Sequence, residues 1–149
     1  MLQDVRAACD MAADKGIKVG LECHLRTVTE NYSSANRFME EAGRDNLYFY
    51  WQPNQFLTLE ENIASAQALL HRTVAVHVFH WIKDRRYPLA AGTGHWMKYL
   101  SVFKNSNVDL PLLLEFMHDD RLESLQPTAK TLTEIVRLAE SGNAAVCRE

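Results

Sequence analysis

Four short apolar runs in this chain each carry, near the carboxyl end, a polar residue that can bind a metal ion. The runs are Lys18–His24, Leu47–Gln52, Val74–His80 and Leu110–Phe116. Two of them contain a glutamate, Glu22 or Glu115, and a buried carboxylate is unfavourable unless it is paired or bound to a cation. Parallel α/β folds place their active sites at the carboxyl ends of the strands. The pattern therefore predicts a site built from strand ends.

Glu22 and His24 are two residues apart, so both side chains point to the same side of a strand. A carboxylate beside an imidazole can bind a divalent metal or transfer protons. The alternative for this pair is an ion pair between Glu22 and a lysine or arginine at the strand end. His77 lies between Val76 and Val78 and is expected to be buried, either as a metal ligand or as a hydrogen-bonded core histidine.

Glu115 gives the strongest single signal because it directly follows three leucines. A carboxylate in that setting needs a cation, several hydrogen-bond donors or a raised pKa, and an arginine such as Arg85 is the alternative partner. Gln52 offers a neutral oxygen, which is either a weak metal ligand or a hydrogen-bonding strand end. His80 has the opposite parity to His77, so on a regular strand the two rings should not face one pocket.

Three further features could contact a substrate. Arg85 and Arg86 could bind a phosphate, or form a pair of solvated loop charges. The segment Gly92–Gly94 could hold an anion or a sugar hydroxyl, or form a tight turn. The tryptophans lie near strand ends or in loops, where they could stack on a sugar or belong to the core; they are Trp51, Trp81 and Trp96.

The elements that would position these residues follow from the spacing of the apolar side chains. Helices are expected at Leu2–Asp14, from Ser33 or Ser34 to Glu41, from a capping box at Thr58 to Leu70, at His95–Phe103, and from Pro127 to Ala139. Strands are expected at Val19–Cys23, Leu47–Trp51, Val74–Phe79 and Leu112–Phe116, with a loop over Lys83–Thr93. One helix followed by four strand–helix units predicts a parallel sheet with right-handed crossovers.

The composition indicates one globular domain, expected to span residues 1–149. A net charge of −3 gives no attraction to nucleic acid, so no nucleic-acid partner is expected. Charged residues interrupt the first 15 residues, so neither a signal peptide nor a membrane segment is expected there. The widely spaced Cys9, Cys23 and Cys147 form no disulfide or metal pattern, which favours the reducing cytoplasm. Without a glycine fingerprint after a strand, no nucleotide cofactor is expected.

Taken together, these motifs resemble the second half of the xylose isomerase-like sugar phosphate isomerase/epimerase family. The resemblance covers Gly16–Leu138 and rests on Gly16–His24, Tyr50–Pro53, His77–Trp81, Pro88–Gly94 and Leu113–Phe116. It implies an α/β fold of the TIM-barrel type, with four parallel βα units that correspond to the second half of a (β/α)₈ barrel. Because a complete barrel needs roughly 250 residues, the chain is expected to be a truncated gene product, half of a homodimer, or a fragment that a complementing N-terminal half-barrel completes.

The resemblance also implies a divalent metal site for manganese, magnesium or cobalt. Family members usually bind the ion with Glu, Asp, His and Glu from the last four strands. By position, Glu22 and Glu115 match the two glutamates, which also act as the catalytic acid and base, and His77 matches the histidine. Gln52 stands where the family usually has aspartate, so it would be a weak fourth ligand.

The substrate implied by the resemblance is a small sugar or sugar phosphate. His24 matches a position that often contacts substrate, and we expect Trp81 and Arg85 to complete the substrate-binding residues. Gln55 stands where a histidine often follows in the family.

Three functions are compatible with this sequence. The first is a sugar or sugar-phosphate isomerase or epimerase that moves a proton beside a carbonyl. The second is a non-catalytic barrel fragment or binding module, which the incomplete barrel and Gln52 both favour. The third is an apurinic-site endonuclease, which shares the barrel but would need a more basic surface and more metal ligands.

Overall fold

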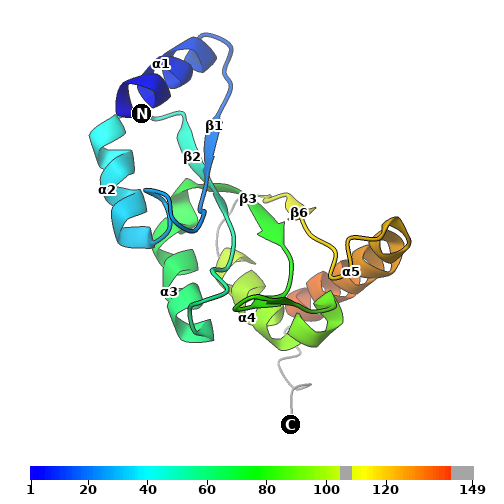
Figure 1. Ribbon diagram of the computed structural model, residues 1–149. Coiled ribbons are helices and arrows are strands. Elements are labelled where there is room, and N and C mark those ends of the chain that lie inside the picture. The colour runs from blue at the N-terminus through cyan, green and yellow to red at the C-terminus, as the bar shows by residue number, and fades with distance from the viewer. Residues whose placement is uncertain (105–108, 142–149) are drawn as a thin grey trace.

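The computed structural model describes residues 1–104 and 109–141 and shows helices alternating with strands (Figure 1). The helices are α1 Leu2–Ala13, α2 Tyr32–Ala42, α3 Leu59–Leu69, α4 Thr93–Lys104 and α5 Leu125–Glu140. The strands are β1 Val19–Glu22, β2 Leu47–Trp51, β3 Thr73–Val78, β4 Trp81–Ile82, β5 Arg85–Arg86 and β6 Leu112–Leu114. Short 3₁₀ turns occupy Leu70–Arg72, Leu89–Gly92 and Leu122–Ser124.

Four of the strands form one parallel sheet in the order β1-β2-β3-β6. Each of these strands is followed by a helix along the chain, which is the expected α/β arrangement of four parallel βα units. Strands β4 and β5 form a separate antiparallel hairpin in the connection between β3 and α4. The predicted loop over Lys83–Thr93 therefore contains a strand and a 3₁₀ turn, because backbone pairing continues across the tight turn at Lys83.

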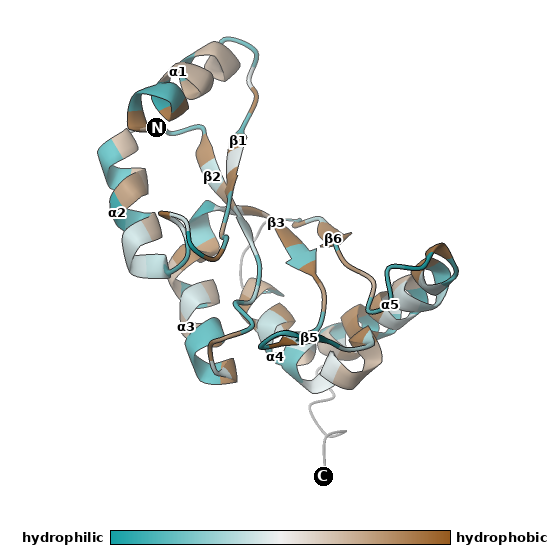
Figure 2. Ribbon diagram, viewed as in Figure 1, coloured by the Kyte–Doolittle hydropathy of each residue, from teal (hydrophilic) through white to brown (hydrophobic). Residues whose placement is uncertain are grey.

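The sheet has one face covered by helices. On β2 the side chains of Leu47, Phe49 and Trp51 are fully buried, whereas Tyr48 and Tyr50 on the other face are half-buried. The helices lie along the outside of the sheet, and each one packs against the next along the chain (Figure 1). Helices such as α2 and α5 carry both hydrophobic and hydrophilic residues, as expected of helices with one face on a sheet (Figure 2).

Local sequence signals explain where most elements begin. Thr58 and Glu61 form the expected capping box at the start of α3, with each side chain bonded to the backbone of the other residue. The predicted cap of α2 at Ser33 or Ser34 is wrong. Asn31 caps this helix instead, since its Oδ1 accepts a hydrogen bond from the Ser34 backbone N–H at 2.9 Å.

The strand ends differ slightly from the expected ones. β1, β3 and β6 stop before Cys23, Phe79 and Glu115, because the loops that follow turn away from regular pairing. Even so, the Glu115 backbone N–H still donates to the Val78 carbonyl at 3.3 Å, which continues the line of β6. Glu115 is therefore fixed at the sheet edge.

Two observations bear on the cysteines and on membranes. Cys9 and Cys23 are free thiols, and burial raises the pKa of the Cys23 thiol to about 12; Cys147 lies outside the described residues. Within the described part of the chain, every helix is too short or too polar to cross a bilayer.

Candidate proton-transfer and metal site

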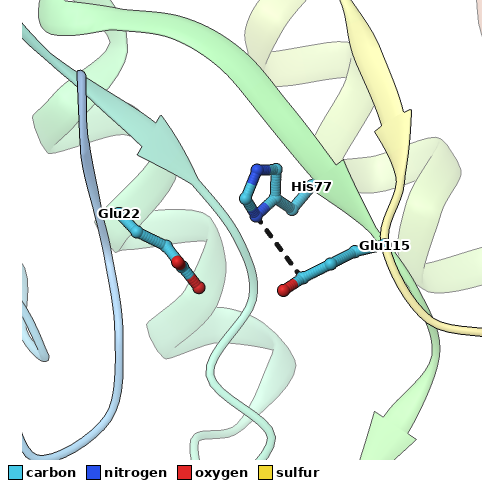
Figure 3. Close-up of side chains that lie close together, drawn as sticks. All are labelled: Glu22, His77 and Glu115. Carbon is cyan, nitrogen blue, oxygen red and sulfur yellow. Dashed lines mark ion pairs between the residues drawn. The ribbon is translucent and has the colours of Figure 1, made fainter. Parts of the chain in front are cut away.

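Three acid or imidazole side chains converge at the carboxyl edge of the sheet. Glu22 ends β1, His77 lies near the end of β3, and Glu115 directly follows β6. One nitrogen or oxygen ligand atom from each lies within 4.8 Å of the others. Figure 3 shows the two glutamate side chains pointing toward each other, with the His77 ring between their strands. The sequence prediction that strand ends bring these residues together agrees with this geometry.

The convergence joins the two outer strands of the sheet. β1 and β6 are the outer strands, and neighbouring strands lie about 4.8 Å apart. A flat four-stranded sheet would thus hold Glu22 and Glu115 roughly 14 Å apart at the backbone, which is three such spacings. Because their carboxylates come within 4.8 Å of each other, both side chains must reach inward over the same face of the sheet, which is the concave face when such a sheet belongs to a barrel.

The His77 ring lies between a neutral and an acidic oxygen. Its Nδ1 is 3.0 Å from Oε1 of Gln52 and 3.4 Å from Oε2 of Glu115. An amide oxygen only accepts hydrogen bonds, so Nδ1 donates to Gln52. Oε2 of Glu115 is then left buried and without a hydrogen-bond partner. An unsatisfied buried carboxylate oxygen is unfavourable, and it indicates a group that needs a proton or a cation.

The electrostatics of Glu115 agree with that interpretation. Burial raises the pKa of the Glu115 carboxyl above its usual value, and the nearby charge of Glu22 raises it further. His77 and His24 act in the opposite direction, because positive charge nearby favours the carboxylate. A carboxyl with a raised pKa is suited to proton transfer near neutral pH.

Packing on the concave face holds the His77 ring. Tyr50 stacks on His77 with ring centroids 5.4 Å apart and an angle of 14° between the planes. The Tyr50 ring in turn lies against Gly20 of β1, where a Cβ atom would come within 2.9 Å of it. Gly20 therefore allows Tyr50 to approach β1 and support the imidazole.

The Glu22 end of the site is held by the loop after β1. Thr29, which is buried, donates its hydroxyl to the Glu22 carbonyl at 2.6 Å and also contacts the Thr27 hydroxyl at 2.9 Å. This fixes the backbone of Glu22 while its side chain faces the concave side.

A family model for xylose isomerase-like TIM barrels matches residues 1–141. The chain belongs to this family. The family includes sugar isomerases and epimerases as well as proteins similar to apurinic-site endonucleases. A search of curated proteins returned no significant match.

The other predicted substrate-binding residues of this xylose isomerase-like chain lie around the cluster at different distances from it. His24 is exposed, and its Nδ1 lies 2.8 Å from the Leu25 carbonyl. Trp81 packs against Phe116, the neighbour of Glu115, with ring centroids 5.0 Å apart. Their contacts with a substrate stay predictions.

The alternative partners considered for the two glutamates are not found. Arg85 is exposed and lies over the Tyr87 ring at 5.5 Å, and the ion-pair partner of Glu115 is His77, so the alternative ion pair between Arg85 and Glu115 is not formed. Within residues 1–104 and 109–141, Glu22 forms no ion pair with a lysine or arginine either.

Tyr50 escaped the sequence reasoning about this site, and Arg86, for which a phosphate contact or a solvated loop charge was expected, makes other contacts. Tyr50 supports His77, and its alternation with the buried Trp51 was the signal that it faces the concave side. Arg86 lies over the rings of Trp81 and Phe116, at 4.7 and 5.2 Å, and pairs with Asp120. Arg86 is therefore not a free loop charge, because its guanidinium packs on Phe116, the residue that follows Glu115.

The tryptophans divide between the core and the edge of the site. Trp51 and Trp96 are fully buried, and their Nε1 atoms donate to the Ser65 hydroxyl and the Phe79 carbonyl respectively. Core packing therefore accounts for these two. Only Trp81, which is half-buried, has a ring in reach of a ligand.

Proposed function

We propose that this chain is a sugar or sugar-phosphate isomerase or epimerase, with Glu22 and Glu115 as the acid and base that move a proton beside a carbonyl. The observation that carries the proposal is the buried Oε2 of Glu115, which lacks a hydrogen bond and faces a second carboxylate and an imidazole. Membership of the xylose isomerase-like family supports the same reaction class.

The two carboxyl groups suit opposite roles in such a transfer. Glu22 and Glu115 come from opposite edges of the sheet, so a substrate carbon between them would meet one on each side. The raised pKa of Glu115 favours its role as the acid, and we assign the role of the base to Glu22. Moving the proton between the two faces gives epimerisation, and moving it to the neighbouring carbon gives isomerisation.

The donor set also fits a divalent cation. Two carboxylates, an imidazole and an amide oxygen are ligands that Mn²⁺, Mg²⁺ or Co²⁺ accept. Nδ1 of His77 carries the proton that it donates to Oε1 of Gln52 at 3.0 Å, so an ion held by Nδ1 would require this proton to move to Nε2. A bound ion would polarise the substrate carbonyl.

Gln52 distinguishes this site from one with a third carboxylate. An amide oxygen carries no formal charge, so the ligand set has two negative charges from Glu22 and Glu115 alone. We therefore expect metal binding to be weaker than in a site with aspartate at this position.

Substrate contacts would come from the rim of the concave face. We propose that His24 binds a sugar hydroxyl, that Trp81 packs on the apolar face of the sugar, and that Arg85 meets a phosphate when one is present. Arg85 is exposed on the hairpin, so a phosphate there would lie outside the Glu22–His77–Glu115 cluster.

The partner that would complete the barrel is also a proposal. β1 and β6 are the outer strands of the described sheet, and strand edges favour pairing with another chain. A second copy of this chain, or a complementing N-terminal half-barrel, would cover the concave face. Light scattering of the purified chain distinguishes a homodimer from a monomer that needs another protein.

Deuterium exchange tests the proposed chemistry directly. The purified chain is incubated in D₂O with Mn²⁺ and a panel of aldoses, ketoses and their phosphates, and deuterium entry at the carbon beside the carbonyl is followed by NMR. Glu115→Gln and Glu22→Gln should each reduce the rate at least 100-fold, in line with the loss of a general acid or base. The control is Glu123→Gln, because Glu123 is exposed and lies outside the site. Equal rates in all three variants would contradict the assignment, and no exchange in any protein would favour the binding-module function.

A further inference from the structure

A cavity lies between the loops at the strand ends and two of the helices. It has a volume of about 200 Å³ and is bounded by the loops that follow β2 and β3 and by the N-terminal halves of α3 and α4. Glu22, His77 and Glu115 do not line it. It is therefore a separate feature of the fold, although Gln52 directly precedes one of its loops.

One buried imidazole in this cavity has no hydrogen-bond partner. His80 is only 7% exposed, lines the cavity, and forms no side-chain hydrogen bond with any of the described residues. Its ring faces His95 of α4, with centroids 5.6 Å apart and planes at 79°. A buried imidazole normally satisfies both ring nitrogens, so those of His80 are free to bond to a group that enters the cavity.

The position of the His80 ring is fixed by its packing. A Cβ atom at Gly92 would lie 2.5 Å from that ring, so only glycine lets the imidazole rest against the backbone there. The sequence analysis predicted that Gly92–Gly94 holds an anion or a sugar hydroxyl, or forms a tight turn. The structure gives Gly92 another role, which is close packing against His80.

The opposite wall of the cavity is fixed as well. Asn62 is buried, and its Nδ2 donates to the carbonyls of Asn54 and Thr58 at 3.0 Å each. Its Oδ1 accepts from the Asn54 backbone N–H at 2.7 Å. One side chain therefore holds both ends of the loop after β2, and the cavity is formed before any ligand binds.

The lining carries no formal charge. Aspartate, glutamate, lysine and arginine are absent from the described residues that line the cavity. Burial lowers the pKa of His80, with His95 adding to the effect, and burial raises the pKa of Tyr99 to about 12. The charge of Glu60 acts on Tyr99, so an anion such as phosphate would lose its hydration here without gaining a counter-charge, and it does not suit this cavity.

We propose that this cavity is a second binding site, which takes a neutral polyhydroxyl molecule of the size of a monosaccharide or pentitol. Imidazole and phenol groups can both donate and accept hydrogen bonds, as hydroxyl groups do, and His80, His95 and Tyr99 provide them. The ring of Phe79 in the wall of the cavity offers apolar surface to the C–H groups of such a molecule. The volume is below the roughly 300 Å³ at which pockets for larger ligands begin. Binding in this cavity requires no catalysis and does not depend on the proposed isomerase or epimerase activity.

Histidine NMR separates this site from the glutamate cluster within one experiment. The chain has six histidines in three pairs: His80 and His95 in the cavity, His24 and His77 at the cluster, and His71 and His118 elsewhere. Xylitol is titrated into ¹⁵N-labelled protein with EDTA present, and the ring nitrogen signals are followed. Saturable shifts at His80 and His95 with the other four unchanged are expected. Shifts confined to His24 and His77, shifts at all six, or no saturable shift up to 100 mM xylitol (roughly the weakest affinity of use) would overturn the proposal.

Two variants test the geometry of the site. Gly92→Ala should push the His80 ring into the cavity and weaken xylitol binding at least tenfold. His95→Gln keeps a polar group but removes the ring, and it should also weaken binding; it serves if Gly92→Ala does not fold. The matched control is Lys98→Ala on the same helix, because Lys98 is exposed and lies outside the lining. Unchanged affinity in folded Gly92→Ala and His95→Gln proteins would contradict the proposed site.

Discussion

The two faces of strands β2 and β3 differ in whether their buried polar groups all have hydrogen-bond partners. On the helix-covered face, Trp51 and Val76 are fully buried, and Nε1 of Trp51 donates to Ser65. On the concave face, Gln52 and His77 bond to each other, yet the adjacent Glu115 keeps a buried oxygen without a partner. The first face stabilises the fold, and the second retains an unsatisfied group where chemistry can take place.

The largest expected effect is a difference in stability between substitutions at two neighbouring residues, Trp51 and Gln52, whose side chains lie on opposite faces. Trp51→Ala leaves a cavity in the core, and such truncations destabilise proteins by about 3–5 kcal/mol. Gln52→Ala removes one hydrogen bond at a half-buried position and should lower the free energy of unfolding by only about 1 kcal/mol. Urea unfolding followed by circular dichroism measures both. Similar losses in the two variants would mean that the faces do not divide stability and function in this way.

A smaller loss of stability is expected for a substitution at Gly20 of β1, which contacts Tyr50 on the concave face. Gly20→Ala places a Cβ atom 2.9 Å from the Tyr50 ring, which must then move away from its stack on His77. We expect a loss of roughly 1–2 kcal/mol in unfolding free energy, typical of an overpacked site. In the Tyr50→Leu background the same change should cost less, because the ring is gone. An equal penalty in both backgrounds would show that Tyr50 is not what Gly20 accommodates.

The smallest expected effect has the opposite sign. Because the pKa of Glu115 is raised in the folded state, this group contributes stability that is complete below its unfolded pKa and is lost as the pH rises through the folded pKa. Glu115→Gln stays neutral and avoids that loss. Without metal, its melting temperature should exceed that of the original chain by a few degrees at pH 7, and the difference should shrink toward pH 4. A variant that melts lower at pH 7 would contradict the raised pKa.

The sequence predicted the fold well because its strong signals are local. The four strands of the parallel sheet are near-continuous apolar runs, and the capping box at Thr58 is a motif of four residues. The cap of α2 was misassigned because Asn31, Ser33 and Ser34 are all good caps, and only the backbone geometry selects Asn31. Boundaries of this kind depend on backbone angles more than on residue type.

The candidate site was predicted in its central part and missed at its margins. Glu22, His77 and Glu115 could be expected together because parallel strands end at one edge of a sheet. Two features depend on packing between segments far apart in the sequence: the stacking of Tyr50 on His77, and the His80 ring that faces His95 without a side-chain hydrogen bond. Parity separated His80 from His77 correctly, but nothing local indicated that His95 of another helix would face it.

The central claim is that Glu22, His77 and Glu115 form a divalent metal and proton-transfer site, and a thermal melt with Mn²⁺ tests it most directly. A ligand that binds only the folded state raises stability by about 2.7 kcal/mol at 100 times its Kd. The account predicts that Mn²⁺ raises the melting temperature of the original chain, raises that of Gln52→Asp at lower metal concentration, and leaves that of Glu115→Gln nearly unchanged. A melting temperature that does not respond to Mn²⁺ in the original chain and in Gln52→Asp, or one that rises equally in Glu115→Gln, would contradict it.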